Sequence, residues 1–218
     1  MITKDTFKFL KDLKKNNNRE WFRSHKPAYD SAYENFYDLV AMLIHQISDF
    51  DESLIGLEPR GCIFRIYRDV RFSKNKLPYK TWFGANLKGG GRKEPGPGYY
   101  FHLDPGNSFA GGGIWHPEKD TLDKIRERLV EKPREFKKVV EGASFKKIFG
   151  ELGGDKLKTA PQGYAKDHAQ IQWLRHKDLV AIKSIPDKTV LSSNIFNDSL
   201  EIFKNIYPLN NFISAAMR

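Results

Sequence analysis

Hydrophobic residues near the N-terminus recur every three or four positions, which is the spacing of a buried helix face. The pattern covers residues 3–15 and again residues 27–47, and it predicts two amphipathic helices. Thr3 is a suitable N-cap for the first helix, and Pro27 fits the first turn of the second. The longer pattern is the clearest helical signal in the chain.

Between residues 62 and 115 the pattern changes to short strands separated by turns rich in Gly and Pro. The predicted strands are 62–72, 81–87, 99–103 and 108–115. Because no helical segment lies between them, we expect an antiparallel meander and not parallel strands joined by helices. The segment 88–98 holds five glycines and two prolines, and we expect a mobile loop there.

Helical spacing returns after Pro117. The predicted elements are helices around 122–129, 136–140, 199–206 and 209–216, and a strand at 179–185. A chain of 218 residues is within the range that folds as one domain. We therefore predict an α+β fold in a single domain, 1–218, in which N-terminal and C-terminal helices flank an antiparallel sheet.

The composition predicts a folded intracellular protein. Hydrophobic residues make up 39% of the chain and aromatic residues 13%, which is too rich in large side chains for disorder. No signal pattern and no apolar run of roughly 18 residues is present, so we expect no membrane partner. Cys62 is the only cysteine and has no internal disulfide partner. These features indicate a cytoplasmic location.

Positive charge is concentrated in one part of the chain. The formal net charge is +10, and the segment 60–93 contains ten Lys or Arg residues against the single acid Asp69. The remaining residues are close to neutral. We expect an anionic partner, if there is one, to meet the protein at this segment.

If residues 62–73 are extended, their side chains alternate between two faces. Cys62, Phe64, Ile66, Val70 and Phe72 would face the core, broken only by Arg68. Arg65, Asp69 and Arg71 would line the other face at spacings of roughly 7 Å, close enough for two guanidinium groups to hold one phosphate or carboxylate. The predicted anion-binding set is Arg65, Asp69, Arg71, Ser73, Lys74, Lys76, Tyr79, Lys80 and, in a glycine run within a predicted strand, Gly112.

Three interpretations of this basic segment remain open. The best supported is a site for an anionic small molecule or a phosphate-bearing ligand, in a binding protein or an enzyme. The second is a nucleic-acid surface, in which Phe72, Tyr79 or Trp82 stacks on bases. The third is a structural or protein-interaction domain, in which Asp69 neutralises its neighbouring arginines in an ion-pair ladder.

The residues 65–81, together with 17–22, 110–113 and 115–117, form a set of motifs that resembles the family called domain of unknown function 2461. The resemblance spans nearly the whole chain and implies a full-length single-domain protein. It implies no established activity, cofactor or catalytic residue. Members of that family often have Asp where this chain has Asn75.

Two histidines are candidate catalytic groups. His102 lies in a predicted strand on the polar sheet face, where nearby arginines would lower its pKa and keep it neutral as a general base. His168 follows Asp167 in a predicted loop. The chain has no metal-binding motif and no phosphate-binding loop, so we expect neither a metal nor a nucleotide cofactor. Oligomeric state cannot be deduced from these patterns.

Overall fold

The computed structural model describes residues 1–218, which form two compact units. The first contains residues 1–92, 100–110 and 184–201, and the second contains residues 93–99, 111–183 and 202–218. The four strands pair in the order β1-β2-β3-β4 as an antiparallel sheet with helices flanking it, which confirms the predicted α+β class. The prediction of a single domain stays a prediction.

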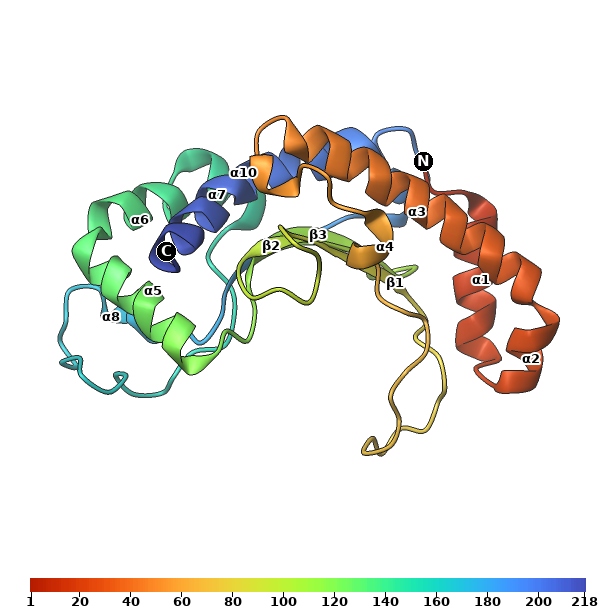
Figure 1. Ribbon diagram of the computed structural model, residues 1–218, viewed down its shortest axis with the longest axis horizontal. Helices are drawn as coiled ribbons and strands as arrows, with labels where there is room; N and C mark the ends of the chain where they lie inside the picture. The colour runs from red at the N-terminus through yellow and green to blue at the C-terminus, as the bar shows by residue number, and fades with distance from the viewer. The chain divides into compact units, whose positions relative to one another are not determined.

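Helices from the N-terminal half build most of the first unit (Figure 1). Its elements are α1 (Lys4–Lys15), α2 (Arg19–Ser24), α3 (Lys26–Ser48), the 3-10 helix η1 (Glu52–Leu54), α4 (Pro59–Cys62), β1 (Phe83–Leu87), most of β2 (Gly98–Leu103), the start of β3 (Phe109–Ile114), α9 (Asp187–Val190) and the first turns of α10 (Ile195–Ala216).

Local sequence explains where the first helices begin. The Thr3 side chain accepts a hydrogen bond from the backbone N–H of Thr6 at 3.1 Å, as predicted for the N-cap of α1. Asn18 caps α2 in the same way through the N–H of Trp21, at 2.9 Å. Pro27 lies in the first turn of α3, where its missing N–H has no helical partner to lose.

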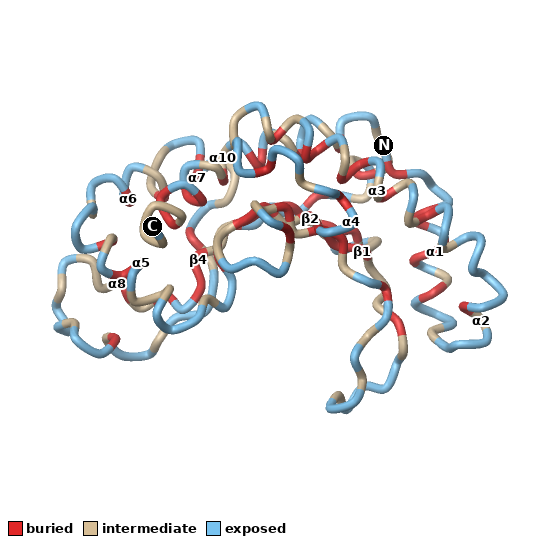
Figure 2. The backbone as a smooth tube through the Cα atoms, in the orientation of Figure 1, coloured by how far each residue is buried: buried red, intermediate tan, exposed pale blue.

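The core of the first unit lies between α3 and one face of the sheet. Phe36 on α3 is fully buried, and its ring lies 5.4 Å from the ring of Phe83 on β1 and 6.1 Å from that of Phe101 on β2. Buried positions accordingly follow the inner sides of α1 and α3 (Figure 2). The strands predicted at 81–87 and 99–103 are therefore confirmed as β1 and β2.

The second unit contains the remaining helices and the strand β4. Its elements are α5 (Lys119–Glu131), α6 (Pro133–Val140), α7 (Ala143–Phe149), α8 (Ile171–Leu174), β4 (Leu179–Ser184) and most of β3 and α10. No helix in the structure is both long enough and apolar enough to span a bilayer.

Two predicted elements were wrong. Residues 62–72 do not form a regular strand, because they make only isolated bridges with the rest of the chain. The two expected C-terminal helices are one continuous helix, α10, with Pro208 inside it. A proline within a helix removes one hydrogen bond, and buried neighbours such as Phe203 and Phe212 keep the helix packed on both sides of it.

Candidate functional site

Residues 63–82, which we call the basic ribbon, form an extended loop that leaves the end of α4 and returns to β1 (Figure 1). Its two arms are joined by the bridge between Tyr67 and Tyr79 and by the hydrogen bond from the Arg68 N–H to the Pro78 carbonyl at 2.9 Å. These backbone contacts hold the two arms side by side, although they do not form a regular pair of strands. The side chains of the ribbon point to both of its faces.

Tyr79 anchors the ribbon to the N-terminal helices. Its side chain is buried, and its ring stacks on that of Phe22 at 4.1 Å. The Asn17 side-chain amide donates to the Tyr79 carbonyl at 3.0 Å and accepts from the Tyr79 N–H at 3.1 Å. Tyr79 thus holds the ribbon in place, and its predicted role in ligand binding or stacking stays a prediction.

The predicted two-faced alternation holds only in part, since Ile63, expected on the polar face, is buried like Cys62. Ile66 is buried, while Arg65 and Asp69 are exposed as expected. Phe72, expected in the core, has 95% of its surface exposed. The reason is that the turn of the ribbon stands away from the core, so the alternation no longer divides a buried side from an open one (Figure 2).

Asp69 and Arg71 form an ion pair near the turn. The Arg71 guanidinium donates to both carboxylate oxygens of Asp69, at 3.0 and 2.7 Å. These hydrogen bonds lower the pKa of Asp69 to about 2. Lys76 nearby donates to the Val70 carbonyl at 3.0 Å. Ser73 and Lys74 complete the turn, where Lys74 is exposed.

Arg65, Arg68 and Lys80 share a hollow of about 550 Å³ beside the ribbon, which we call the cationic hollow. Arg71 is not among its lining residues, so the predicted clamp of Arg65 with Arg71 does not form, and Arg68 takes the place of Arg71. The full lining is Asn17, Arg65, Tyr67, Arg68, Asp69, Asn75, Leu77, Tyr79, Lys80, Thr81 and Trp82.

Positive charge in the cationic hollow is crowded. The Lys80 ammonium donates to the carbonyls of Arg65 and Tyr67, at 2.5 and 3.2 Å, which holds it between the two arms. Burial lowers the pKa of Lys80, and the nearby guanidinium groups of Arg65, Arg68 and Arg92 lower it further. The Arg65 side chain has no hydrogen bond or ion pair within the protein. An anion entering here would meet cations that lack acidic partners.

A second hollow of about 530 Å³, the helical hollow, adjoins the first. Arg19 and Arg23 on α2 and Lys26 on α3 line it, and Lys26 is paired with Asp30. Arg68 lines both hollows. Sequence reasoning missed the three helical cations, although Arg19 lies inside one of the motifs that indicated the family. The presence of Arg19 in that motif was the only feature of the sequence that could have pointed to this hollow.

The two candidate histidines lie elsewhere. His102 is on β2, and the Tyr100 hydroxyl lies 3.1 Å from its Nδ1. Its pKa is lowered, but burial is the cause and not the arginines that the sequence suggested. In the second unit, the Nδ1 of His168 accepts a hydrogen bond from the Gln170 N–H at 3.1 Å. Neither histidine lines the cationic hollow.

Gly112, also in the second unit, is enclosed by its neighbours. A Cβ atom there would lie 2.3 Å from the Gly98 carbonyl oxygen and 2.6 Å from the Ile206 side chain. Close packing therefore explains the glycine. No group of three or more His, Cys, Asp or Glu side chains converges on a point suitable for a metal ion.

The fold and the ribbon define a class of protein: an α+β chain with an antiparallel sheet, flanking helices and a basic extension beside β1. The family described as conserved hypothetical protein (DUF2461) matches residues 5–212, and the chain belongs to this family. No curated protein and no solved structure matches the chain.

Proposed function

We propose that this protein binds a phosphate-bearing anion in the cationic hollow. One observation carries the proposal: Arg65, Arg68 and Lys80 meet in one hollow whose only acidic lining residue, Asp69, is already bound by Arg71. Guanidinium groups hold phosphate oxygens through paired N–H donors, and an ammonium adds a compact charge. The hollow offers both kinds of group.

The ion-pair ladder explains less of the geometry. Asp69 uses both carboxylate oxygens on Arg71, which leaves Arg65 without a hydrogen-bond partner. An exposed pair of this kind contributes only about 0–1 kcal/mol to stability. Lys80 and Arg68 donate to carbonyls of the ribbon, whereas the Arg65 guanidinium makes no hydrogen bond, and an external anion would supply it with acceptors.

Titration calorimetry with inorganic pyrophosphate at physiological salt tests the proposal. Arg65→Gln should weaken binding by about 10- to 100-fold, because a hydrogen bond to a charged group contributes about 1.5–3 kcal/mol. The matched control is Arg134→Gln, which removes an exposed arginine on α6. Arg71→Ala should weaken binding less than Arg65→Gln, since Arg71 does not line the hollow.

A thermal unfolding measurement on the same variants separates binding from structure. In the ligand-free protein the exposed Arg65 side chain makes no hydrogen bond and lies among other cations, so Arg65→Gln should leave the Tm unchanged or raise it. A lowered Tm together with unchanged pyrophosphate affinity would assign Arg65 to the fold and overturn the proposed function.

A further inference from the structure

The sheet face opposite α3 carries a cluster of half-buried aromatic rings. Because alternate residues of a strand point to opposite faces, this face receives Trp82, Tyr100, His102 and Phe109, and Phe64 lies next to it. The His102 ring lies 4.7 Å from both the Trp82 and Phe109 rings and is stacked on Phe109. We call these five residues the aromatic face.

Gly84 on β1 allows the rings to lie across the sheet. A Cβ atom at this position would lie 2.7 Å from the Tyr100 hydroxyl and 2.9 Å from Cζ3 of Trp82. The two side chains therefore occupy the space above the glycine. A side chain at this position would displace both rings, so the glycine keeps them together on this face of the sheet.

Cations border the aromatic face. The Lys80 ammonium lies 5.6 Å from the centre of the Trp82 ring, and the Arg92 guanidinium lies 5.9 Å from that of Phe64. Lys80 and Trp82 also line the cationic hollow, so the aromatic face and the hollow are one continuous surface.

That surface extends further than a small anion requires. The cationic hollow shares Arg68 with the helical hollow, which adds Arg19 and Arg23 on α2. Positive groups therefore continue from α2, past the ribbon, to the sheet. A ligand that matches the whole surface carries several negative charges in a row and flat apolar rings beside them.

We propose that this surface binds single-stranded nucleic acid, with phosphates along the two hollows and a base stacked on Trp82 beside Lys80. This inference rests on the proposed function, because the cationic hollow supplies its phosphate contacts. A duplex keeps its base faces stacked inside, so a stacking surface selects the single strand. Aromatic side chains next to backbone-binding cations are the usual basis of such binding.

Fluorescence anisotropy with a labelled oligothymidylate of about 12 nucleotides provides the test. An abasic strand of equal length carries the same phosphates without bases, and the wild-type protein should bind it roughly 5- to 150-fold more weakly. Trp82→Leu should produce a loss in the same range for the oligothymidylate. The matched control, Trp115→Leu, replaces a tryptophan that is 73% exposed in the second unit and should change nothing.

Salt dependence and pyrophosphate binding identify which proposal fails. Arg65→Gln should reduce the slope of log affinity against log salt by about 0.7, the value for one phosphate of a single strand. Equal binding of abasic and base-bearing strands, or equal binding by the two Trp→Leu variants, overturns the stacking inference. If pyrophosphate binding still depends on Arg65 in that case, the proposed function stands. If neither pyrophosphate nor oligonucleotide binds, both are overturned.

Discussion

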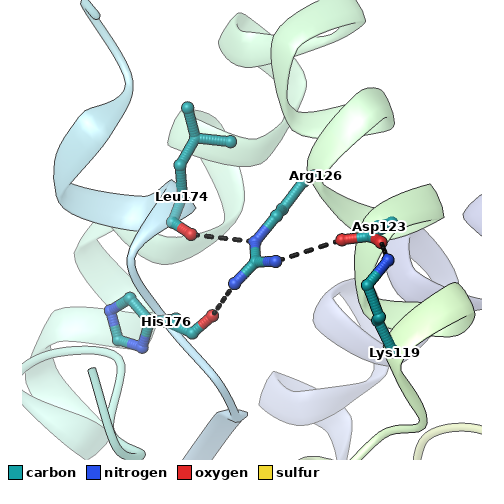
Figure 3. Close-up of polar contacts among 5 residues, drawn as sticks. All are labelled: Lys119, Asp123, Arg126, Leu174 and His176. Carbon is teal, nitrogen blue, oxygen red and sulfur yellow. Dashed lines mark hydrogen bonds and ion pairs between the residues drawn. The ribbon is translucent and has the colours of Figure 1, made fainter. Parts of the chain in front are cut away.

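Arg126 on α5 offers the sharpest test of the packing in the second unit. It is a buried arginine, with 7% of its surface exposed, and Figure 3 shows its polar contacts. Its Nε donates to the Leu174 carbonyl at 3.0 Å, and its Nη2 donates to the His176 carbonyl at 3.4 Å. The Nη1 atom donates to Asp123 at 3.1 Å. One side chain thus joins α5 to the segment that contains α8.

Arg126→Met keeps an unbranched apolar stem and removes every donor. Leu174 and His176 are buried, and an unsatisfied buried carbonyl costs about 1–3 kcal/mol. The ion pair with the part-exposed Asp123 contributes only about 0–1 kcal/mol. Since the variant no longer has to desolvate a guanidinium, part of the loss is offset. We expect a net loss of about 2–5 kcal/mol, or about 4–20 °C in Tm for a chain of this size.

Denaturant unfolding followed by circular dichroism, together with calorimetric Tm values, measures this loss. Arg134→Met is the matched control, because it makes the same replacement at an exposed position on α6. Arg126→Lys keeps the positive charge but loses the planar guanidinium group and most of its N–H donors. Its stability should therefore fall between those of the wild type and Arg126→Met. If Arg126→Met and Arg134→Met are equally stable, the two carbonyls do not depend on Arg126 and the reasoning is refuted.

Three further predictions concern the core, the titration of buried groups and the single thiol. Phe36→Ala should lower the free energy of unfolding by about 3–5 kcal/mol in denaturant titration, because it removes a fully buried ring between α3 and the sheet. Burial lowers the pKa of His102 and His176 from 6.5, so the unfolded chain binds more protons and stability should fall as the pH drops below 6.5; His102→Gln/His176→Gln should flatten this dependence. Burial raises the pKa of Cys62 to about 11, so a thiol reagent at pH 8 should label it only in denaturant.

The sequence was informative where local pattern and tertiary burial agree. The long amphipathic pattern became α3, and the predicted strands 81–87 and 99–103 became β1 and β2 with Phe83 and Phe101 in the core. In each case one side of the element has an apolar partner along its whole length. The apolar positions of the element then mark the side that packs against that partner.

The ribbon shows where this agreement ends. Residues 62–72 alternate as a strand does, yet only the base of the ribbon has a core beside it, and Phe72 at the turn is exposed. An alternating pattern indicates that a segment is extended. It does not indicate over what length the segment packs against the rest of the fold. For the same reason, Arg71 was assigned to a site with Arg65, and the structure instead pairs Arg71 with Asp69.

Buried and converging cations were the hardest features to predict. Arg126 lies in a helix with many charged residues, where an arginine is usually solvated, and only the carbonyls of a segment about 50 residues away make it a buried group. Arg19 and Arg23 likewise line a hollow together with Arg68 only because α2 packs beside the ribbon. The stacking of Phe22 on Tyr79 is part of that packing. Such sites depend on long-range packing that no local window contains.

The distribution of charge connects the fold with the proposed site. The segment 60–93 has ten basic residues and one acid, although the rest of the chain is nearly neutral and could have supplied more acids. Crowding like charges destabilises a folded protein, and the pKa of Lys80 is lowered first by burial and then by the neighbouring guanidinium groups. The single acid, Asp69, lines the cationic hollow, but its carboxylate oxygens are hydrogen-bonded to Arg71 and not to Arg65. An anion bound in the hollow would add negative charge beside Arg65, Arg68 and Lys80, which supports the proposed function.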